Sequence, residues 1–420
     1  MSSIFIQIAS YRDRELLPTL RDIVDKSSKN HQLTFGIVWQ KDQTESIDEF
    51  AHQSNVRIID CDWQNSKGLG WARSLTQSLY ENEDFTLQLD SHHRFAQSWD
   101  EELIKMYNSL LPISQKPLLT SYAASYDANT NIILNNKPCK ILPIDFKSSG
   151  TIWFNPVQIT NDEELKRPIR ARFVSGHYFF TTGLHCKEYI YDPNLYFAGD
   201  EIALSARSFT MGYDLYHPNI NLVWHHYGRN DRIKHWGDHN SAHKEQGIID
   251  KTWNERDIES KKRIRQLLGE EDYGIDLGIY GLGNQRTIQD YEKYGGFDFK
   301  NRRIQQNAIH GVEPPVSYDS EIEWNNGFRK IIPIKINQFD KEVFIKKIDT
   351  ISLVKLDLIS LHRKIIYSQM CGSHIFNNDS IDILCNSEHT PMKYIIYGLD
   401  SNLNVVHKYE KDLRHYIHWN

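Results

Sequence analysis

The stretch TLQLDSHHRF, residues 86–95, begins as an alternating apolar run and then places Asp90, Ser91, His92 and His93 in consecutive positions. The apolar part is typical of a buried β-strand. A strand that ends in a carboxylate, a hydroxyl and two imidazoles is either a polar turn or a site for a metal ion and phosphate groups. Both the fold and the function depend on which of these two interpretations is correct.

Strand-like and helix-like runs alternate over the first 90 residues of the chain. The strand-like runs are SIFIQIA (3–9), LTFGIVWQ (33–40), NVRIIDCDW (55–63) and FTLQLD (85–90). Between them, residues 14–29, 45–54 and 68–80 are helix-like. This alternation predicts an α/β domain on a parallel sheet with helices on its faces. Ligands of such sheets bind at the carboxyl ends of the strands.

The D-x-H triplet of Asp90 and His92 is a candidate metal site at one of these strand ends. A carboxylate and an imidazole two residues apart can turn toward one point and hold a divalent cation, and the imidazole favours Mn²⁺ over Mg²⁺. In a nucleotide-sugar enzyme such an ion neutralises the leaving diphosphate. His225 and His226, which end a later predicted strand, are candidates for a further ligand. Either of them could instead be a structural core histidine.

Polar loops follow three of the predicted strands and are expected to meet at the same edge of the sheet. They are ASYRD (9–13), CDWQNSKGLG (61–70) and DSHHR (90–94). The forked donors of Arg12 and Arg73 suit a base, a ribose or a diphosphate, although either residue could be a solvated surface arginine. The candidates for nucleotide-sugar binding are Ser10, Tyr11, Arg12, Arg73, Asp90 and Ser91.

Two further pairs of residues are candidates for the chemistry and for a sugar pocket. Asp200 and Glu201 open a helix-like run at 199–212, where they could act as a base, orient an acceptor or stabilise positive charge on a sugar ring. The alternative is a pair of acidic residues that stabilises the start of a helix. Trp153 and His177 are candidates for an acceptor or sugar pocket, because the faces of sugars stack on aromatic rings.

Composition excludes several other classes of protein. The net charge of −6 and the pI near 6.3 argue against a nucleic-acid partner. There is no P-loop and no G-x-G-x-x-G motif after a strand, which argues against an ATPase or a dinucleotide oxidoreductase. Five cysteines without C-x-x-C spacing, no signal-peptide pattern and no long apolar run predict a cytoplasmic protein without a transmembrane segment. Peripheral association with the inner membrane face and oligomerisation remain open.

The character of the sequence changes near residue 312. A proline-bearing connection is followed by short β-rich runs that are separated by Asn, Asp, Gly and Ser. We therefore expect a catalytic domain at 1–312 and a C-terminal accessory domain at 316–420, mostly antiparallel β and sandwich-like.

The chain resembles the glycosyltransferase family of polypeptide α-N-acetylglucosaminyltransferases, whose best known members modify hydroxyproline on a cytosolic ubiquitin-ligase subunit. The stretches that carry the resemblance are IASYRD (8–13), GLGWARSL (68–75), LQLDSHHRF (87–95), SGHYFFTTG (175–183), FAGDEIALSARSFTMGYDLYHP (197–218), VWHHYGR (223–229) and YGLGNQRTIQDYEKYGG (280–296). Together they are far more specific than any single motif. The C-terminal β domain lies outside the resemblance.

The resemblance implies a GT-A fold, which is a Rossmann-like nucleotide-sugar-binding domain, and transfer with retention of configuration at the anomeric carbon. It implies UDP-N-acetylglucosamine as the donor, with Asp90, His92 and a later histidine on Mn²⁺ or Mg²⁺. The acceptor would be a hydroxyl group on a glycan or a protein. The alternative from a different class is a non-catalytic protein that keeps the fold and binds a glycan or a nucleotide-sugar.

Overall fold

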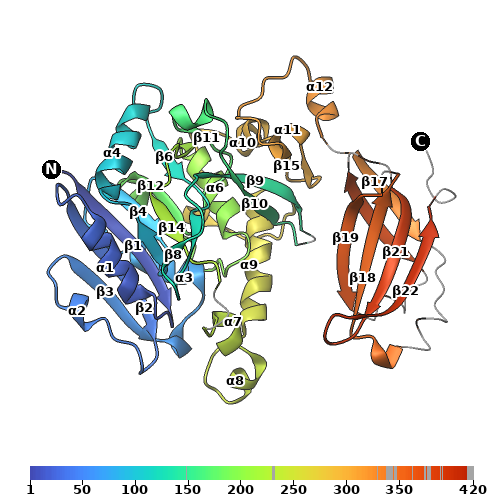
Figure 1. Ribbon diagram of the computed structural model, residues 1–420, viewed down its shortest axis with the longest axis horizontal. Helices are drawn as coiled ribbons and strands as arrows, with labels where there is room; N and C mark the ends of the chain where they lie inside the picture. Colours follow the sequence, from blue (N-terminus) through green and yellow to red (C-terminus); the bar gives the residue numbers. More distant parts are fainter. Residues whose placement is uncertain are drawn as a thin grey trace. The chain divides into compact units, whose positions relative to one another are not determined.

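The computed structural model describes residues 1–147, 149–228, 232–328, 330–336, 344, 348–361, 363–372, 375, 380–387, 389 and 391–413. The chain divides into two compact units, Met1–Ser317 and Tyr318–Asn420 (Figure 1). The boundary expected at residues 312–316 lies beside this division.

An eight-stranded sheet in the order β11-β13-β6-β12-β4-β1-β2-β3 is the centre of the first unit. Its N-terminal strands are β1 (Ser3–Tyr11), β2 (Gln32–Lys41), β3 (Val56–Asp62) and β4 (Phe85–Leu89). These four pair in parallel, as predicted. The helices between them are α1 (Leu16–Lys26), α2 (Asp48–Ala51) and α3 (Leu69–Gln77).

The other half of the sheet is mixed. It contains β6 (Pro117–Thr120), β11 (Ile169–Arg170), β12 (Tyr178–Thr182) and β13 (Asp214–His217). Residues 171–177, which include Gly176, form a loop that precedes β12. β12 therefore runs antiparallel to β4, with Tyr178 opposite Leu89. The start of β12 consequently lies at the edge where β4 ends.

A second, four-stranded sheet brings the histidine-bearing segments together. It consists of β5 (His93–Phe95), β14 (Val223–His225), β7 (Ala124–Asp127) and β8 (Ile132–Ile133), in that order. β14 is antiparallel to β5, and His225 lies opposite His93. Residue 229, the last residue of the stretch VWHHYGR (223–229), lies outside the described residues.

The remaining elements of the first unit surround the sheets. The helices are α4 (Trp99–Leu110), α5 (His185–Glu188), α6 (Asp200–Thr210), α7 (His235–Asp238), α8 (Ser241–Glu245), α9 (Trp253–Leu267), α10 (Ile288–Gly295) and α11 (Gln306–Ile309). The strands are the hairpin of β9 (Cys139–Phe146) and β10 (Ile152–Gln158), and the pair β15 (Phe297–Asp298) and β16 (Arg303–Ile304). Among the described residues, every helix is too short or too polar to cross a lipid bilayer.

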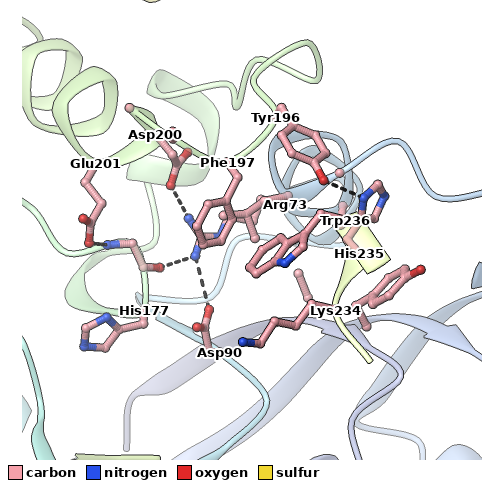
Figure 2. Close-up of a pocket in the computed structure, with 18 of the residues that line it drawn as sticks. Arg73, Asp90, His177, Tyr196, Phe197, Asp200, Glu201, Lys234, His235 and Trp236 are labelled. Carbon is pink, nitrogen blue, oxygen red and sulfur yellow. Dashed lines mark hydrogen bonds and ion pairs between the residues drawn. The ribbon is translucent and has the colours of Figure 1, made fainter. Parts of the chain in front are cut away.

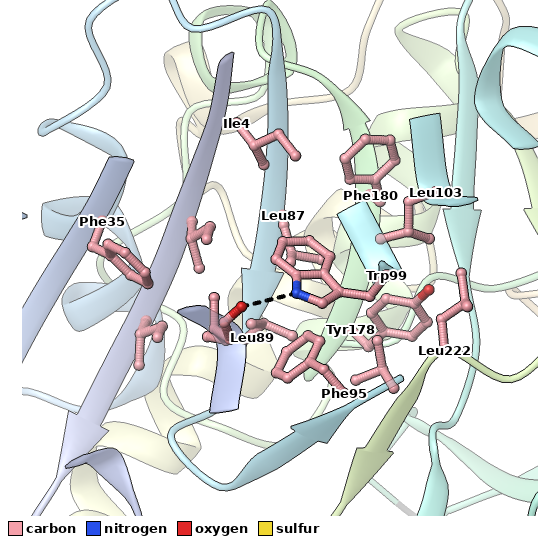
Figure 3. Close-up of a cluster of buried hydrophobic side chains, with 14 of the residues drawn as sticks. Ile4, Phe35, Leu87, Leu89, Phe95, Trp99, Leu103, Tyr178, Phe180 and Leu222 are labelled. Atoms are coloured by element: carbon pink, nitrogen blue, oxygen red, sulfur yellow. Dashed lines mark hydrogen bonds between the residues drawn. The ribbon is translucent and has the colours of Figure 1, made fainter. Parts of the chain in front are cut away.

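Two large hydrophobic clusters lie in the first unit. The first cluster packs β1, β2 and β4 against α1 and α4 (Figure 3). The second cluster packs the β9–β10 hairpin against α6, α9 and α10. Trp99 is fully buried in the first cluster, and its indole N–H donates to the Ile23 carbonyl at 3.0 Å.

The second unit is mostly antiparallel β, as predicted. β17 (Lys330–Ile336) pairs with β20 (Ile381–Ser387), and a four-stranded sheet has the order β19-β18-β21-β22. The bounds of its strands are β18 (Leu353–Ser360), β19 (Ile365–Gly372), β21 (Pro391–Leu399) and β22 (Val405–Asp412), and a short helix, α12 (Glu321–Asn326), precedes the sheets. Side chains of both sheets share one core. The first of the β-rich runs after residue 316 is RKIIPIKINQF (329–339), of which residues 329 and 337–339 lie outside the described residues.

The fold class is thus confirmed as an α/β domain on a large sheet with parallel strands, followed by a mostly antiparallel β domain.

Replacing Trp99 with alanine should destabilise the protein by about 3–5 kcal/mol, because it removes a fully buried tryptophan side chain from the first cluster and leaves a cavity. Urea unfolding followed by far-UV circular dichroism measures the change. Ile113→Ala, at a side chain that is 67% exposed, is the control and should change stability by less than about 0.5 kcal/mol. Equal effects of the two substitutions would contradict the packing described for Trp99.

Candidate functional site

A cleft of about 500 Å³ opens at the edge where β1 and β4 end and β12 begins (Figure 2). One wall is formed by the ends of the parallel strands and the start of α3. The other wall is formed by the β9–β10 hairpin and the start of α6, which belong to the second hydrophobic cluster. Of the residues predicted for the site, the cleft is lined by Tyr11, Arg73, Asp90, Ser91, His92, Trp153, His177, Asp200, Glu201 and His225.

Asp90, His92 and His225 form a group that could hold a metal ion. One ligand atom from each residue lies within 4.8 Å of the other two. The Nε2 atoms of His92 and His225 are 3.6 and 3.5 Å from Asp90 Oδ2. Asp90 and His92 lie in the turn between β4 and β5, and the pairing of β14 with β5 brings His225 beside them. One carboxylate and two imidazoles suit a borderline divalent metal.

A buried carboxylate contacts the Nδ1 atom of the His92 ring. Asp13 Oδ2 lies 2.7 Å from His92 Nδ1 and also accepts a hydrogen bond from Ser91 Oγ at 2.6 Å. Arg232 forms an ion pair with the same carboxylate. A carboxylate on Nδ1 directs Nε2 of the ring toward the group, as is common for metal-binding histidines.

The charge states of the group match those that a divalent cation requires. Burial and then the neighbouring His177 lower the pKa of His225 far below its ordinary value, so the ring is neutral. Burial alone would raise the pKa of Asp90, but its contacts with His225, His92 and Arg73 hold that pKa well below the ordinary value. A neutral imidazole and an ionised carboxylate are the forms that bind a metal. Among the described residues, the buried Nδ1 of His225 has no hydrogen-bond partner.

The other two histidines of these segments point elsewhere. His226 Nδ1 lies 3.3 Å from the Tyr126 carbonyl and 3.4 Å from the Ala128 amide, and His226 is not in the group with Asp90. His93 Nδ1 lies 2.9 Å from the Trp224 carbonyl. The geometry therefore favours His225 over His226 as the late histidine.

The guanidinium of Arg73 joins the metal-binding group to the acidic start of α6 (Figure 2). It is 3.3 Å from Asp90 Oδ1, donates to the Gly176 carbonyl at 2.5 Å and to the Tyr191 hydroxyl at 2.8 Å, and forms an ion pair with Asp200. Its side chain is almost completely buried. Arg73 is thus an internal cation shared by two carboxylates, and not a surface arginine.

Asp200 and Glu201 both face the cleft from the first turn of α6. Burial raises the pKa of Asp200, although Arg73 opposes this effect. Burial raises the pKa of Glu201 to about 7, even though Glu201 accepts hydrogen bonds from the Gly176 amide at 2.9 Å and the Tyr122 hydroxyl at 2.5 Å. A carboxyl group with this pKa can exchange a proton near neutral pH.

The loop after β1 contributes less directly than expected. Ser10 is buried and, like Arg12, is not among the residues that line the cleft. Arg12 forms ion pairs with Asp42 at 2.8 Å and Asp238 at 2.9 Å. Tyr11 lines the cleft, and its hydroxyl donates to Asp238 at 2.8 Å.

Trp153 and His177 have very different environments. Trp153, on β10, is 57% exposed at the cleft. His177 is buried, with its ring 4.4 Å from the ring of His225, and accepts a hydrogen bond from the Ala123 amide at 3.2 Å. Trp153 can therefore offer a ring face to a ligand, whereas His177 mainly supports the histidine group.

Several lining residues were not singled out in the sequence. They are Tyr122, Lys147, Phe197, Lys234, His235 and Trp236, and Asp13 stands behind the cleft. Asp13 is the last residue of the ASYRD loop and could have been included with it. Phe197 begins the stretch 197–218 that carries the family resemblance, although nothing in that stretch marks it as a lining residue. The others lie in segments without such a motif, so only the folded chain brings them together.

A family model described as Glycosyltransferase (GlcNAc) matches residues 3–53 and 46–301. The match covers more than half of the chain, so the chain belongs to this glycosyltransferase family. It does not distinguish the subgroup that modifies hydroxyproline. A search of curated proteins found no match.

Several solved structures align with this chain at low sequence identity and low TM-score. GalNAc-T7 with UDP, GalNAc and Mn²⁺ aligns with a TM-score of 0.45 and 14% identity, over 70% of this chain and 54% of that chain. TarS of S. aureus aligns with a TM-score of 0.36 and 10% identity, over 98% of this chain and 77% of that chain. Residues 1–349 of TarS in complex with UDP-GlcNAc align with a TM-score of 0.37 and 10% identity, over 65% of this chain and 77% of that chain. The chain spans about half the length of GalNAc-T7, and similarity at this level transfers no function.

The raised pKa of Glu201 predicts a specific pH dependence of stability. In the folded state the pKa of Glu201 is about 7, above its ordinary value of 4.5, so the folded state binds the proton of Glu201 more tightly than the unfolded state does. Protonation of Glu201 therefore stabilises the folded state, and this stabilisation is lost as pH rises through 7. Relative to Glu201→Gln, the wild type should lose about 3 kcal/mol of unfolding free energy between pH 4.5 and 8. Urea unfolding at a series of pH values, without added metal, measures this loss.

Glu163→Gln, at an exposed glutamate outside the cleft, is the matched control and should leave the pH dependence of the wild type unchanged. The interpretation of Glu201 is wrong if the Glu201→Gln variant and the wild type have parallel stability curves.

Proposed function

We propose that the protein transfers N-acetylglucosamine from UDP-N-acetylglucosamine to a hydroxyl group on a glycan or a protein, with retention of configuration and with Mn²⁺ or Mg²⁺ as cofactor. The observation that carries the proposal is the group of Asp90, His92 and His225 in a cleft beside Arg73. The family description, which names GlcNAc, supports the sugar. A cytoplasmic location remains a prediction from cysteine usage.

The residues present fit a divalent cation. Asp90 supplies a carboxylate oxygen, His92 and His225 supply imidazole nitrogens, and Asp13 orients His92. This donor set favours Mn²⁺ over Mg²⁺, which prefers oxygen ligands. When bound, the cation supplies neutralisation of the negative charge on the leaving diphosphate.

The chain itself would orient the donor. Arg73 fixes the positions of Asp90 and Asp200 by contacting both carboxylates. Tyr11 and Ser91 line the cleft on the strand side, where a nucleotide would lie. Arg12 supports this wall indirectly, because it holds Asp238 against Tyr11.

The start of α6 would orient hydroxyl groups of the sugar or the acceptor. Asp200 Oδ1 is buried and has no hydrogen-bond partner among the described residues, so it can accept a bond from a ligand hydroxyl. Glu201, with its pKa near 7, can hold or release a proton beside it. In retaining transfer, the bond from the anomeric carbon to the phosphate oxygen breaks as the acceptor oxygen bonds to the same face. The acceptor proton passes to the departing phosphate, so no strong base is required.

Replacing the neighbouring residues His225 and His226, one at a time, with glutamine tests the proposal. Release of UDP from UDP-N-acetylglucosamine with Mn²⁺ should fall about 100-fold in His225→Gln, because a ligand of the cation is lost. His226→Gln is the matched control and should stay within about fivefold of the wild type. Mn²⁺ binding followed by electron paramagnetic resonance should weaken only in His225→Gln.

Two results would contradict the proposal. Full activity of His225→Gln, or wild-type turnover in EDTA, would exclude the metal-dependent mechanism. Tight binding of UDP-N-acetylglucosamine without any UDP release would favour the non-catalytic nucleotide-sugar-binding alternative.

A further inference from the structure

Three large aromatic side chains are exposed at the cleft, on β10, just before α6 and on α7. Trp153 is 57%, Phe197 49% and Trp236 41% exposed, and all three line the cleft. Phe197 and Trp236 lie side by side, with ring centroids 5.6 Å apart (Figure 2). Exposed aromatic rings gathered at one cleft mark a binding surface. The flat faces of these rings suit the apolar C–H faces of pyranose sugars.

A lysine accompanies each of the two tryptophans. Lys147 Nζ lies 5.7 Å from the ring centroid of Trp153, and Lys234 Nζ lies 5.5 Å from that of Trp236. Within the part of the chain that the structure describes, neither ammonium forms an ion pair with a carboxylate. The acidic residues of the cleft are already engaged, since Asp90 and Asp200 contact Arg73 and Glu201 accepts two hydrogen bonds. The charges of both lysines are therefore available to a ligand.

The Lys147–Trp153 pair has a defined backbone. The Lys147 amide donates to the Thr151 carbonyl at 2.7 Å, and the Gly150 amide donates to the Lys147 carbonyl at 2.9 Å. This turn connects β9 to β10, whose side chains pack in the second hydrophobic cluster. The pair is thus held on the wall opposite the strand ends that carry Asp90 and His92.

We propose that Lys147 with Trp153 and Lys234 with Trp236 form an acceptor subsite for an anionic glycan. Sugar rings of the acceptor stack on the indoles, and its carboxylate or phosphate groups pair with the two ammonium groups. This inference rests on the proposed function, because it takes the ends of β1 and β4 as the side of the cleft that binds the donor and the exposed aromatic side chains of β10 and α7 as the surface that binds the acceptor. A neutral glycan would cover the two ammonium groups without supplying a negative charge, which disfavours its binding.

Matched pairs of charged and neutral glycans test the subsite directly. The probes are an oligogalacturonate and its methyl ester, and a phosphorylated oligomannose and its dephosphorylated form. Isothermal titration with the full chain, saturated with UDP and Mg²⁺, should give at least about fivefold tighter binding of one charged glycan than of its neutral form. The pair that shows the preference identifies carboxylate or phosphate as the anion. The preference should weaken as salt is raised.

Variants separate charge from stacking. Lys147→Ala should reduce the preference for the charged glycan about fivefold, and Lys147→Arg should retain it. Trp153→Ala should weaken binding of both forms about fivefold. Lys105→Ala, at a lysine that does not line the cleft, is the control and should leave binding unchanged.

Equal affinity for the charged and neutral forms would overturn the inference. It would also be overturned if Lys147→Ala weakened the binding of UDP but not of the glycan, or if a neutral hydroxyproline peptide bound and no glycan did. The assay separates this inference from the proposed function. Charge-selective binding by a wild type that releases no UDP from UDP-N-acetylglucosamine would reject the proposed function and support the subsite.

Discussion

The buried guanidinium of Arg73 is the interaction on which the site depends. Asp90, Asp200 and Glu201 line the same cleft, and their carboxylates would repel one another if no cation were present. Arg73 contacts two of these carboxylates and also the carbonyl of Gly176, at the start of β12. A charge buried to this degree requires paired carboxylates and hydrogen-bond acceptors, which Arg73 has at both terminal nitrogens, whereas its buried Nε has no partner among the described residues. The side chain of Arg73 therefore fixes the position of the strand ends relative to the start of α6.

This arrangement divides the cleft between two hydrophobic clusters. The metal-binding group lies at the ends of strands that belong to the first cluster, whereas the β9–β10 hairpin and α6 belong to the second. The wall that carries Trp153 can vary in its side chains without disturbing the packing behind Asp90. Changes in acceptor preference could thus arise by substitution on the hairpin while the handling of the donor is retained.

The sequence was sufficient for the parallel half of the sheet and for the Asp90–His92 turn. Local alternation of apolar residues and helical spacing determine these elements, and Asp90 comes directly after β4. The direction of β12 could not be predicted, because it depends on where the long segment before Tyr178 returns to the sheet. The choice between His225 and His226 depended on the register of β14 with β5, which no local pattern encodes. Lys147 and Lys234 belong to no sequence motif, and only the folded structure shows that they lie beside exposed tryptophans.

The pairing of β5 with β14 has a consequence for how the protein matures. His92 precedes β5 directly and His225 ends β14, so the ligand set is split between segments that are far apart along the chain. A growing polypeptide carries Asp90 and His92 long before His225 has been synthesised, and at that stage it offers only a two-ligand fragment. In the proposed metal site, a cation would be retained firmly only after the distant strand has docked, so metal capture would report that the domain has completed its folding.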